Sequence, residues 1–373
     1  MDKNNLNKAI ELRHELHKIA ELSEKEINTK KLLIKYIKEN TSLEVIDKGL
    51  WFYAKYDAKS PENPIGFRAD FDAISVDETI KLPYASKNKG VSHKCGHDGH
   101  AATLMGLALE IDKYGAKRDT YFVFQHAEEI GTGAKLASEI VLEKNIKEIY
   151  AYHNYPGIPL GNIGITDATV CFASMGIIIK LHGVSSHASE PEKGINPAFA
   201  AANIINKLCE LTSVDINKGL VLATVVQVDI GEEAFGVSAH EGKLSITLRA
   251  EIAEEMGKLK TNIEEFTKEQ VEKYGLSLEI EYSDIFPETR NNKKAADKIR
   301  NIARSNGYNI YEMEALRTSE DYGYFLEKTK GAMMWIGAGT DSHPLHSVEY
   351  DFNDDLIEIA VDFNKLLIWR GDE

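Results

Sequence analysis

The feature that most restricts the fold of this chain is an alternation of short apolar strands with helices. Strands and helices that alternate in this way are typical of a layered α/β domain. After Pro287 the same pattern resumes, with a helix at 293–306, a strand at 332–336 and a closing helix at 354–367. In the first part of the chain the alternating segments are the strand patterns 65–69, 121–125 and 149–152 and the helical patterns 101–111 and 133–142.

A different pattern interrupts this alternation from about residue 168. Its order is β-α-β-β-α-β, which is that of a self-contained ferredoxin-like sandwich. We therefore predict one α/β domain formed by residues 1–167 and 287–373, and a smaller domain, 168–286, inserted into it. The segments of the insert are the strands 176–181, 220–230, 243–251 and 277–285 and the helices 197–211 and 254–274.

Composition excludes several classes of function. The chain has 44 Lys and Arg against 59 Asp and Glu, a formal net charge of −15, which argues against a nucleic-acid or anionic-membrane surface. No apolar run is long enough to span a membrane, and the first residues lack the apolar stretch of a secretory signal. The three cysteines are widely spaced, so a disulfide framework is not expected. A cytoplasmic protein is predicted.

The densest group of chemically competent side chains is Ser92–His100, in which three histidines, a cysteine and an aspartate occur within nine residues. Cys95 and His97 are separated by one residue, so on an extended loop both can turn toward one point. A thiolate and an imidazole suit zinc. The alternatives are a closed structural zinc site or ordinary polar loop residues.

A second group, Glu128 and Glu129, directly follows the strand at 121–125. Adjacent carboxylates point in different directions, so one can bind a metal while the other accepts a proton from water. An isolated Glu-Glu pair is more often a solvated surface.

Two further groups are His153, expected just beyond the strand at 149–152, and the loop Asp341–His346. Either would more often be structural when taken alone. However, all four groups follow predicted strands, where open α/β sheets gather their ligands, so one convergent site explains them together. Five or more ligands are many for one tetrahedral zinc, which favours two metals.

Together with other segments, these residues resemble a known family. The landmarks run nearly end to end, and they are 12–17 (LRHELH), 67–73 (FRADFDA), 93–100, 127–129 (AEE), 182–188 (HGVSSHA), 319–322 (SEDY) and 344–347 (PLHS). The chain resembles the metallo-amidohydrolases that include hippurate hydrolase, N-acetyl-diaminopimelate deacetylase and auxin-conjugate hydrolases, within the aminoacylase and carboxypeptidase G superfamily. The resemblance implies a mixed-sheet metallopeptidase-like catalytic domain whose insert serves as a lid and as a homodimer interface.

The same resemblance implies roles for individual residues. Glu128 would be the general base, and His187, on the insert, would stabilise the oxyanion, either within its own subunit or across a dimer contact. The cofactors would be two divalent ions, zinc or manganese. The implied metal ligands are Cys95, His97, Glu129, His153 and His346.

Some positions depart from the family pattern or carry weaker expectations. His126 and Ala20 stand where proline is usual, which leaves the substrate open. Asp72 and Asp98 could orient ligand histidines or act as strand-end and helix caps. His93 and His100 are expected to support the site, His14 and His17 to be structural, and Cys171 and Cys209 to be small buried residues. Candidates to hold a substrate carboxylate are Arg249, Arg290 and Arg317, each with a structural ion pair as the alternative.

We therefore predict a metal-dependent amidohydrolase that acts on the amide of a small-molecule N-acyl amino acid. The alternatives are a dipeptidase or carboxypeptidase that uses the same residues, and a catalytically silent metal-bound binding protein.

Overall fold

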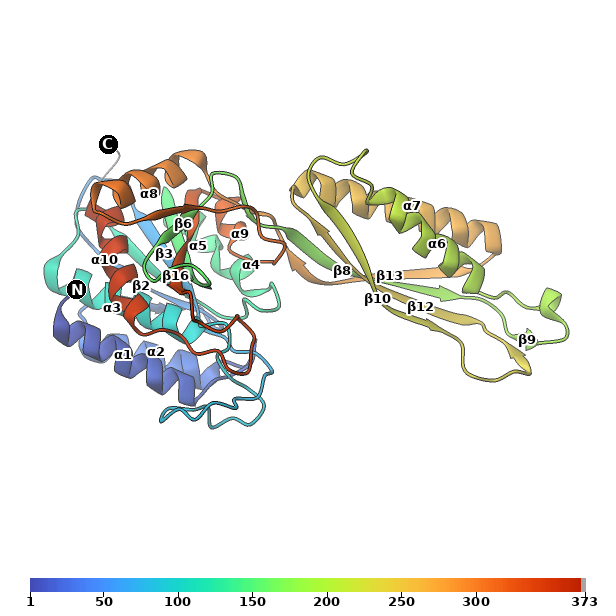
Figure 1. Ribbon diagram of the computed structural model, residues 1–373, viewed down its shortest axis with the longest axis horizontal. Coiled ribbons are helices and arrows are strands. Elements are labelled where there is room, and N and C mark those ends of the chain that lie inside the picture. Colours follow the sequence, from blue (N-terminus) through green and yellow to red (C-terminus); the bar gives the residue numbers. More distant parts are fainter. Residues whose placement is uncertain (370–373) are drawn as a thin grey trace. The chain divides into compact units, whose positions relative to one another are not determined.

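The computed structural model describes residues 1–369 of the chain. These residues form two compact units (Figure 1). Among the described residues, unit 1 consists of Met1–Val170, Thr289–Glu314 and 320–369, and unit 2 consists of Cys171–Glu288 and Ala315–Ser319. The segment 315–319 therefore packs with unit 2, although the sequence pattern assigned it to the catalytic domain.

Unit 1 is built on a mixed sheet, which within residues 1–369 has eight strands in the order β1-β2-β4-β3-β5-β16-β6-β15. The central pairs β4–β3, β3–β5 and β5–β16 are parallel, whereas β2 pairs with β4 in the antiparallel sense. Side chains of β3 and β4 are buried along their whole length, as expected for parallel strands covered on both faces. The strands are β1 (Glu44–Asp47), β2 (Phe52–Tyr56), β3 (Ile65–Asp70), β4 (Thr120–Gln125), β5 (Glu148–Pro156), β6 (Ile163–Ile165), β15 (Ile310–Glu312) and β16 (Lys330–Gly339).

Helices complete the core of unit 1. One continuous apolar cluster joins side chains of α1, α2, α3, α8 and α10 to the strands. The middle of this layer is α3, which is rich in small residues and buried from His97 to Ile111, so that other helices pack closely around it. The helices are α1 (Lys3–Lys18), α2 (Ile27–Asn40), α3 (His97–Tyr114), α4 (Gly133–Ala137), α5 (Glu139–Glu143), α8 (Lys293–Ser305), α9 (Gly323–Leu326) and α10 (Asp355–Trp369).

The carboxyl ends of the central strands position the polar residues. Asp70 ends β3 and is paired with Gln125 at the end of β4, and the turn that carries Glu128 and Glu129 follows directly. The prediction that His153 lies beyond its strand is wrong, because β5 continues to Pro156 and His153 is paired with Trp335 of β16 inside the sheet.

Unit 2 has the order β8-α6-β10-β12-α7-β13, the β-α-β-β-α-β order that the sequence pattern indicates. Its antiparallel sheet has the strand order β10-β12-β8-β13, and α6 and α7 contribute apolar side chains to one core with it. The elements are β8 (Ala173–His182), α6 (Ala198–Leu211), β10 (Val221–Ile230), β12 (Glu241–Ala250), α7 (Ala253–Tyr274) and β13 (Ser277–Phe286), and a short pair joins β9 (Ser186–His187) to β11 (Val237–Ser238).

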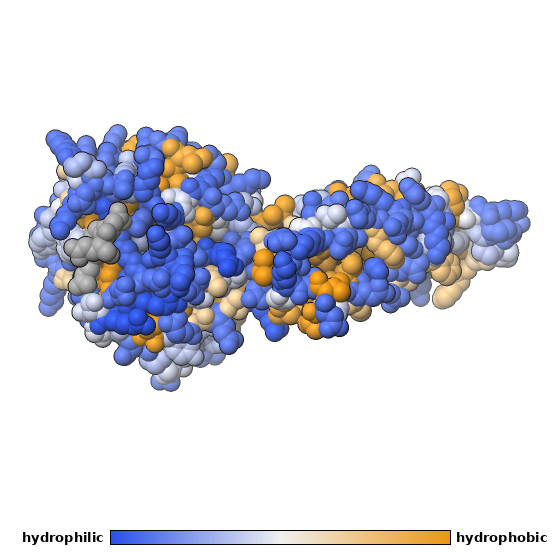
Figure 2. All heavy atoms as spheres, turned by 90° about the horizontal axis from the view of Figure 1, so that it is seen from above, coloured by the Kyte–Doolittle hydropathy of each residue, from blue (hydrophilic) through white to orange (hydrophobic). Residues whose placement is uncertain are grey.

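Several large apolar side chains of unit 2 are exposed. They include Val226 and Val228 on the edge strand β10, and Phe235 and Val237 in the segment that follows it. Figure 2 shows one face of the molecule, on which hydrophobic residues lie in patches between hydrophilic ones. Among the described residues, no helix combines the length and the apolar character that a membrane crossing requires.

Candidate metal centre and catalytic residues

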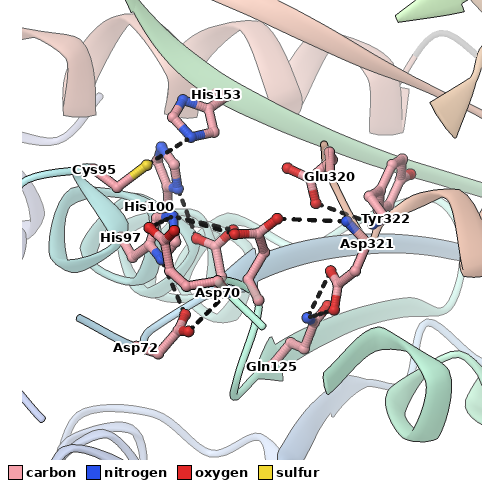
Figure 3. Close-up of polar contacts among 12 residues, drawn as sticks. Asp70, Asp72, Cys95, His97, His100, Gln125, His153, Glu320, Asp321 and Tyr322 are labelled. Atoms are coloured by element: carbon pink, nitrogen blue, oxygen red, sulfur yellow. Dashed lines mark hydrogen bonds and ion pairs between the residues drawn. The ribbon is translucent and has the colours of Figure 1, made fainter. Parts of the chain in front are cut away.

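The five side chains predicted as metal ligands come together in unit 1. The liganding atoms of Cys95, His97 and His153 all lie within 4.8 Å of one another, and so do those of Cys95, Glu129 and His346. The thiol of Cys95 belongs to both groups and joins them into one cluster. In Figure 3, Cys95, His97 and His153 lie on one side of the site, and Gln125, Glu320 and Asp321 on the other.

Short distances link the members of this cluster. The Cys95 Sγ lies 3.5 Å from the His153 Nε2. The Glu129 Oε1 lies 3.7 Å from the His97 Nε2 and 3.5 Å from the His346 Nε2. The two separations from the Glu129 oxygen are too long for good hydrogen bonds between nitrogen and oxygen, and they leave room for a cation among the groups.

Hydrogen bonds on the far side of each ring fix the histidines. The His97 Nδ1 lies 3.0 Å from a carboxylate oxygen of Asp72, and the His153 Nδ1 lies 2.8 Å from the backbone carbonyl of Asn154. Because each Nδ1 faces an oxygen acceptor, it carries the proton, and the lone pair of each Nε2 points into the cluster. Of the two alternatives for Asp72, the structure therefore supports the orienting role.

The donor set is suited to a divalent cation. Within residues 1–369, the His97 Nε2 and the Glu129 Oε1 are buried and have no hydrogen-bond partner. Burial and the nearby Glu129 carboxylate raise the pKa of the Cys95 thiol, and a cation beside it would have the opposite effect. A thiolate, imidazoles and a carboxylate match zinc, and the imidazole and carboxylate members also suit manganese.

The turn after β4, which carries Glu128 and Glu129, has an unusual backbone. Ala127 has a positive φ of 48°, and its N–H donates to the buried Glu26 carboxylate at 2.7 Å. The Glu129 N–H donates at 3.0 Å to Asp72, which also holds His97. One aspartate therefore connects two candidate ligands, and one liganding atom each of His97, Glu128 and Glu129 lie within 4.8 Å of one another.

Glu128 lies beside the cluster and is buried. Its Oε2 is 4.0 Å from the His97 Nε2, and its Oε1 accepts a long hydrogen bond of 3.4 Å from the Asp321 N–H. Burial, and then the carboxylates of Glu320 and Glu129, raise the pKa of Glu128 well above its usual value. A carboxylate with a raised pKa is a better proton acceptor, as a general base requires.

Arg68 arranges the carboxylates around Glu128. This fully buried guanidinium binds Asp70 at 2.7 Å, Asp321 at 2.8 Å and Glu320 at 3.2 Å. This role was not predicted from the sequence, because Arg68 lies inside an apolar strand and two of its three partners, Glu320 and Asp321, are about 250 residues away in the chain.

Two expectations about supporting residues need correction or refinement. Asp98 does not contact a candidate ligand, and its carboxylate instead binds Arg13 and His17, each at 2.8 Å. His100 cannot serve as a ligand in this arrangement, because its Nδ1 faces Asp70 and its Nε2 faces the Asn154 Oδ1, both at 2.6 Å. His100 instead supports the strand that carries His153.

The remaining candidates lie away from the cluster or lack a demonstrated role. His93 is buried, and neither of its ring nitrogens has a hydrogen-bond partner in the described chain. His126 is also buried, and this burial lowers its pKa. Cys171 is buried as expected, whereas the expectation of a buried Cys209 is wrong, since its side chain is exposed. His14 binds Asp354 at 2.8 Å, in keeping with a structural role.

The cluster is formed by residues of unit 1, whereas His187, Arg249 and Arg317 belong to unit 2. His187 is an exposed residue of β9 in unit 2, and its Nδ1 lies 2.7 Å from the Ser189 hydroxyl. Arg249 donates to the Arg317 carbonyl at 2.7 Å and to Ser319 at 2.8 Å, all within unit 2. The oxyanion role of His187 and the carboxylate-binding role of an arginine remain predictions.

Comparison with known proteins gives the class to which this fold and site belong. The sequence pattern of peptidase family M20/M25/M40 matches residues 66–370, which is most of the chain. The chain belongs to this peptidase family. The resemblance, the α/β fold class and the prediction of a metal-dependent amidohydrolase are thereby confirmed.

Individual relatives agree with this membership. The chain is 29% identical over 360 residues to the N-acetyldiaminopimelate deacetylase of Exiguobacterium sibiricum, covering 95% of this chain and 96% of the relative. It is 28% identical over 363 residues to the Bacillus subtilis protein of the same name, covering 95% and 96% of the two chains.

Solved structures show the same fold. A putative aminohydrolase from methicillin-resistant Staphylococcus aureus superposes with a TM-score of 0.91 at 23% identity, over 98% of this chain and 97% of the other. The YXEP protein of Bacillus subtilis, described as a dinuclear metal-binding peptidase, has a TM-score of 0.84 at 24% identity, over 99% and 98% of the two chains.

Proposed function

We propose that this protein removes the acyl group from an N-acyl amino acid by metal-dependent hydrolysis of the amide bond. The observation that carries the proposal is the convergence of Cys95, His97, Glu129, His153 and His346, from four separate segments, beside the buried carboxylate of Glu128. The name N-acetyldiaminopimelate deacetylase of the curated relatives supports an acetylated amino acid as the substrate class.

The cluster has enough ligands for two divalent ions, zinc or manganese, and the description of the YXEP protein as dinuclear supports that number. When bound, such ions supply Lewis-acid polarisation of the carbonyl and lower the pKa of the attacking water. His97 and His153 offer Nε2 because Asp72 and the Asn154 carbonyl occupy their Nδ1 sides.

Glu128 performs the proton transfers. Its carboxylate accepts a proton from water as the oxygen attacks the acyl carbon, and then delivers this proton to the nitrogen of the leaving amine as the C–N bond breaks. The products are a carboxylate and a free amino group. His187 would donate a hydrogen bond to the oxyanion that develops on the acyl oxygen, a role supported by the sequence resemblance.

A replacement of Glu128 by glutamine tests this mechanism. We expect Glu128→Gln to bind zinc or manganese with nearly unchanged stoichiometry, and to lose about 10²- to 10⁴-fold or more in kcat, because the amide cannot accept the proton. Metal content is measured by elemental analysis, and turnover by release of the free amine. Equal turnover in the variant and the unchanged protein would exclude Glu128 as the base.

A substrate panel separates the alternatives. Release of amino acids from N-acetyl and N-benzoyl compounds is the expected result, whereas cleavage of dipeptides alone would indicate a dipeptidase or carboxypeptidase. A protein that binds metal but cleaves no member of the panel would be the silent binding protein.

Assembly and location are also proposals. A homodimer through unit 2 is supported by the exposed apolar residues Val226 and Val228 on the edge strand β10. Sedimentation of the purified protein tests it, and a monomer at micromolar concentration would exclude it. The cytoplasmic location remains a prediction from the sequence.

A further inference from the structure

A group of buried charges lies next to the candidate metal centre without belonging to it. It consists of Arg13, His17, Glu78, Lys94 and Asp98, and is called the buried charge chain below. Arg13 and His17 lie on α1, and the side chains of both are fully buried. The Arg13 Nε and the His17 Nδ1 each lie 2.8 Å from the same Asp98 oxygen.

Glu78 connects this pair to Lys94. Its carboxylate lies 3.0 Å from the His17 Nε2 and accepts a hydrogen bond of 2.6 Å from the Lys94 Nζ. The Ser86 N–H adds a third hydrogen bond at 2.7 Å. His17 therefore lies between two carboxylates, and cationic and anionic groups alternate from Arg13 to Lys94.

Two members of the buried charge chain, Lys94 and Asp98, adjoin candidate ligands in the sequence. Lys94 directly precedes Cys95, and Asp98 directly follows His97, so these two members flank this ligand pair in the sequence. Asp98 accepts a hydrogen bond of 2.9 Å from the Gly99 N–H in the first turn of α3. The start of α3, and with it His97, is thereby held against α1.

Lys94 also holds the segment that carries His346. The Lys94 carbonyl accepts the His346 N–H at 2.7 Å, while its ammonium group donates to the Tyr350 carbonyl at 2.8 Å. His346 has a positive φ of 64°, a conformation that a non-glycine residue keeps only when its surroundings enforce it. One lysine therefore restrains two ligand segments that are about 250 residues apart in the chain.

Stability alone is a weak reason for such an arrangement. The desolvation free energy of buried charges is about as large as the free energy of their mutual attraction. Apolar residues of similar size in the same place are often as stabilising. A buried charge network does fix geometry, because a charged group that loses its partners inside the protein is costly in free energy. Residues that hydrogen-bond to metal ligands, without binding the metal themselves, fix the orientation of those ligands.

We propose that the buried charge chain is a positioning device that holds Cys95, His97 and His346 in the geometry required for metal binding. The proposal rests on the metal-dependent function proposed above. In this proposal its members act through the candidate ligands and not on the metal or the substrate, so they are positioning residues. The competing explanation is that they only stabilise the packing of α1 and α3.

Lys94→Met and Lys365→Met form a matched pair that separates these explanations. Each change removes an ammonium group and leaves a carboxylate without its lysine, Glu78 in the first case and Glu110 in the second. The side chains of these glutamates are 5% and 1% exposed. Lys365 binds Glu110 at 2.7 Å, toward the end of α3 that is far from His97.

The probe is Co²⁺, because a cysteine thiolate bound to cobalt gives a charge-transfer absorption in the near ultraviolet. Affinity is measured by competition with a chromophoric chelator, and folding by circular dichroism. We expect Lys94→Met to bind Co²⁺ about 10- to 100-fold more weakly, with a reduced or shifted thiolate band. Lys365→Met should keep the affinity and the spectrum of the unchanged protein, and Lys94→Arg should recover most of both.

Opposite outcomes overturn the proposal. It is wrong if Lys94→Met folds and binds Co²⁺ with unchanged affinity and spectrum, or if Lys365→Met loses as much affinity. If Lys94→Met does not fold, the milder His17→Gln takes its place, and unchanged cobalt affinity in that variant would exclude a positioning role. If the wild-type protein binds no Co²⁺, the proposed function is overturned, and this inference falls with it.

Discussion

Replacing Asp72 by asparagine should weaken metal binding, because no orientation of the amide reproduces the contacts of the carboxylate. Asp72 accepts three hydrogen bonds, from His97 at 3.0 Å, from the Glu129 N–H at 3.0 Å and from the Ser23 hydroxyl at 2.8 Å. If the amide oxygen faces His97, the NH₂ group opposes the Glu129 N–H. If the amide is turned over, its NH₂ forces the proton of His97 onto Nε2, which removes the lone pair that would bind a metal.

The expected magnitude follows from these contacts. Either orientation loses at least one hydrogen bond to a charged acceptor, worth about 1.5–3 kcal/mol. Loss of a residue that orients a ligand typically weakens metal binding about 10- to 100-fold, or about 1.4–2.8 kcal/mol, which agrees. We therefore expect the dissociation constant for zinc or manganese to rise by 10- to 100-fold (about 1.4–2.8 kcal/mol) in Asp72→Asn.

The assay is a titration of metal-free protein with zinc in competition with a chromophoric chelator. Ser23→Ala is the matched control. It removes a hydrogen bond to Asp72 Oδ2, the oxygen that also accepts from the Glu129 N–H, and it changes no residue of a ligand segment. It should cost about 1 kcal/mol of stability and leave the metal affinity nearly unchanged. An Asp72→Asn protein that binds zinc within about twofold of the unchanged protein would refute the reasoning.

Three further predictions concern the turn after β4, the segment before α3 and the insert. Burial and the Asp72 carboxylate raise the pKa of Glu26 to about 7 from 4.5. Between these two pH values the folded protein keeps a proton on Glu26 that the unfolded chain has lost. The contribution of Glu26 to the free energy of unfolding therefore falls as pH rises from about 4.5 to 7. In the metal-free protein, Glu26→Gln should reduce the fall in the free energy of unfolding between pH 5 and pH 8, measured with urea, by up to about 3 kcal/mol. The same fall in the variant and the wild-type protein would contradict this. Gly96→Ala should destabilise the fold by about 1–3 kcal/mol and weaken metal binding. The reason is that Gly96 has φ 100° and an added Cβ would lie 2.6 Å from the Asn154 side chain. An unchanged Tm in calorimetry would exclude the expected destabilisation. His187→Ala should lower kcat by about 10²- to 10³-fold with metal content intact, and an unchanged kcat would remove His187 from the mechanism.

Part of the information about which residues come together at the site is local in the sequence. Cys95 and His97 lie in one dense segment, and Glu128 and Glu129 directly follow an apolar strand whose end is set by its own hydrophobic pattern. The edge where parallel strands end is the same for all of them, so residues after separate strands could be expected to meet. The β-α-β-β-α-β order of the insert was readable for a similar reason, since each element has its own periodicity.

Only the tertiary structure decided which residues support the ligands. Asp98 follows His97 in the sequence, yet successive residues of a helix point about 100° apart, so Asp98 turns toward α1 while Asp72 from another segment reaches His97. Glu78 lies in an irregular segment without any periodic pattern, and its role depends on contacts with residues 16 and 61 positions away. The types of ligand are set by local sequence, whereas the orientation of each ligand depends on long-range packing, which no local pattern encodes.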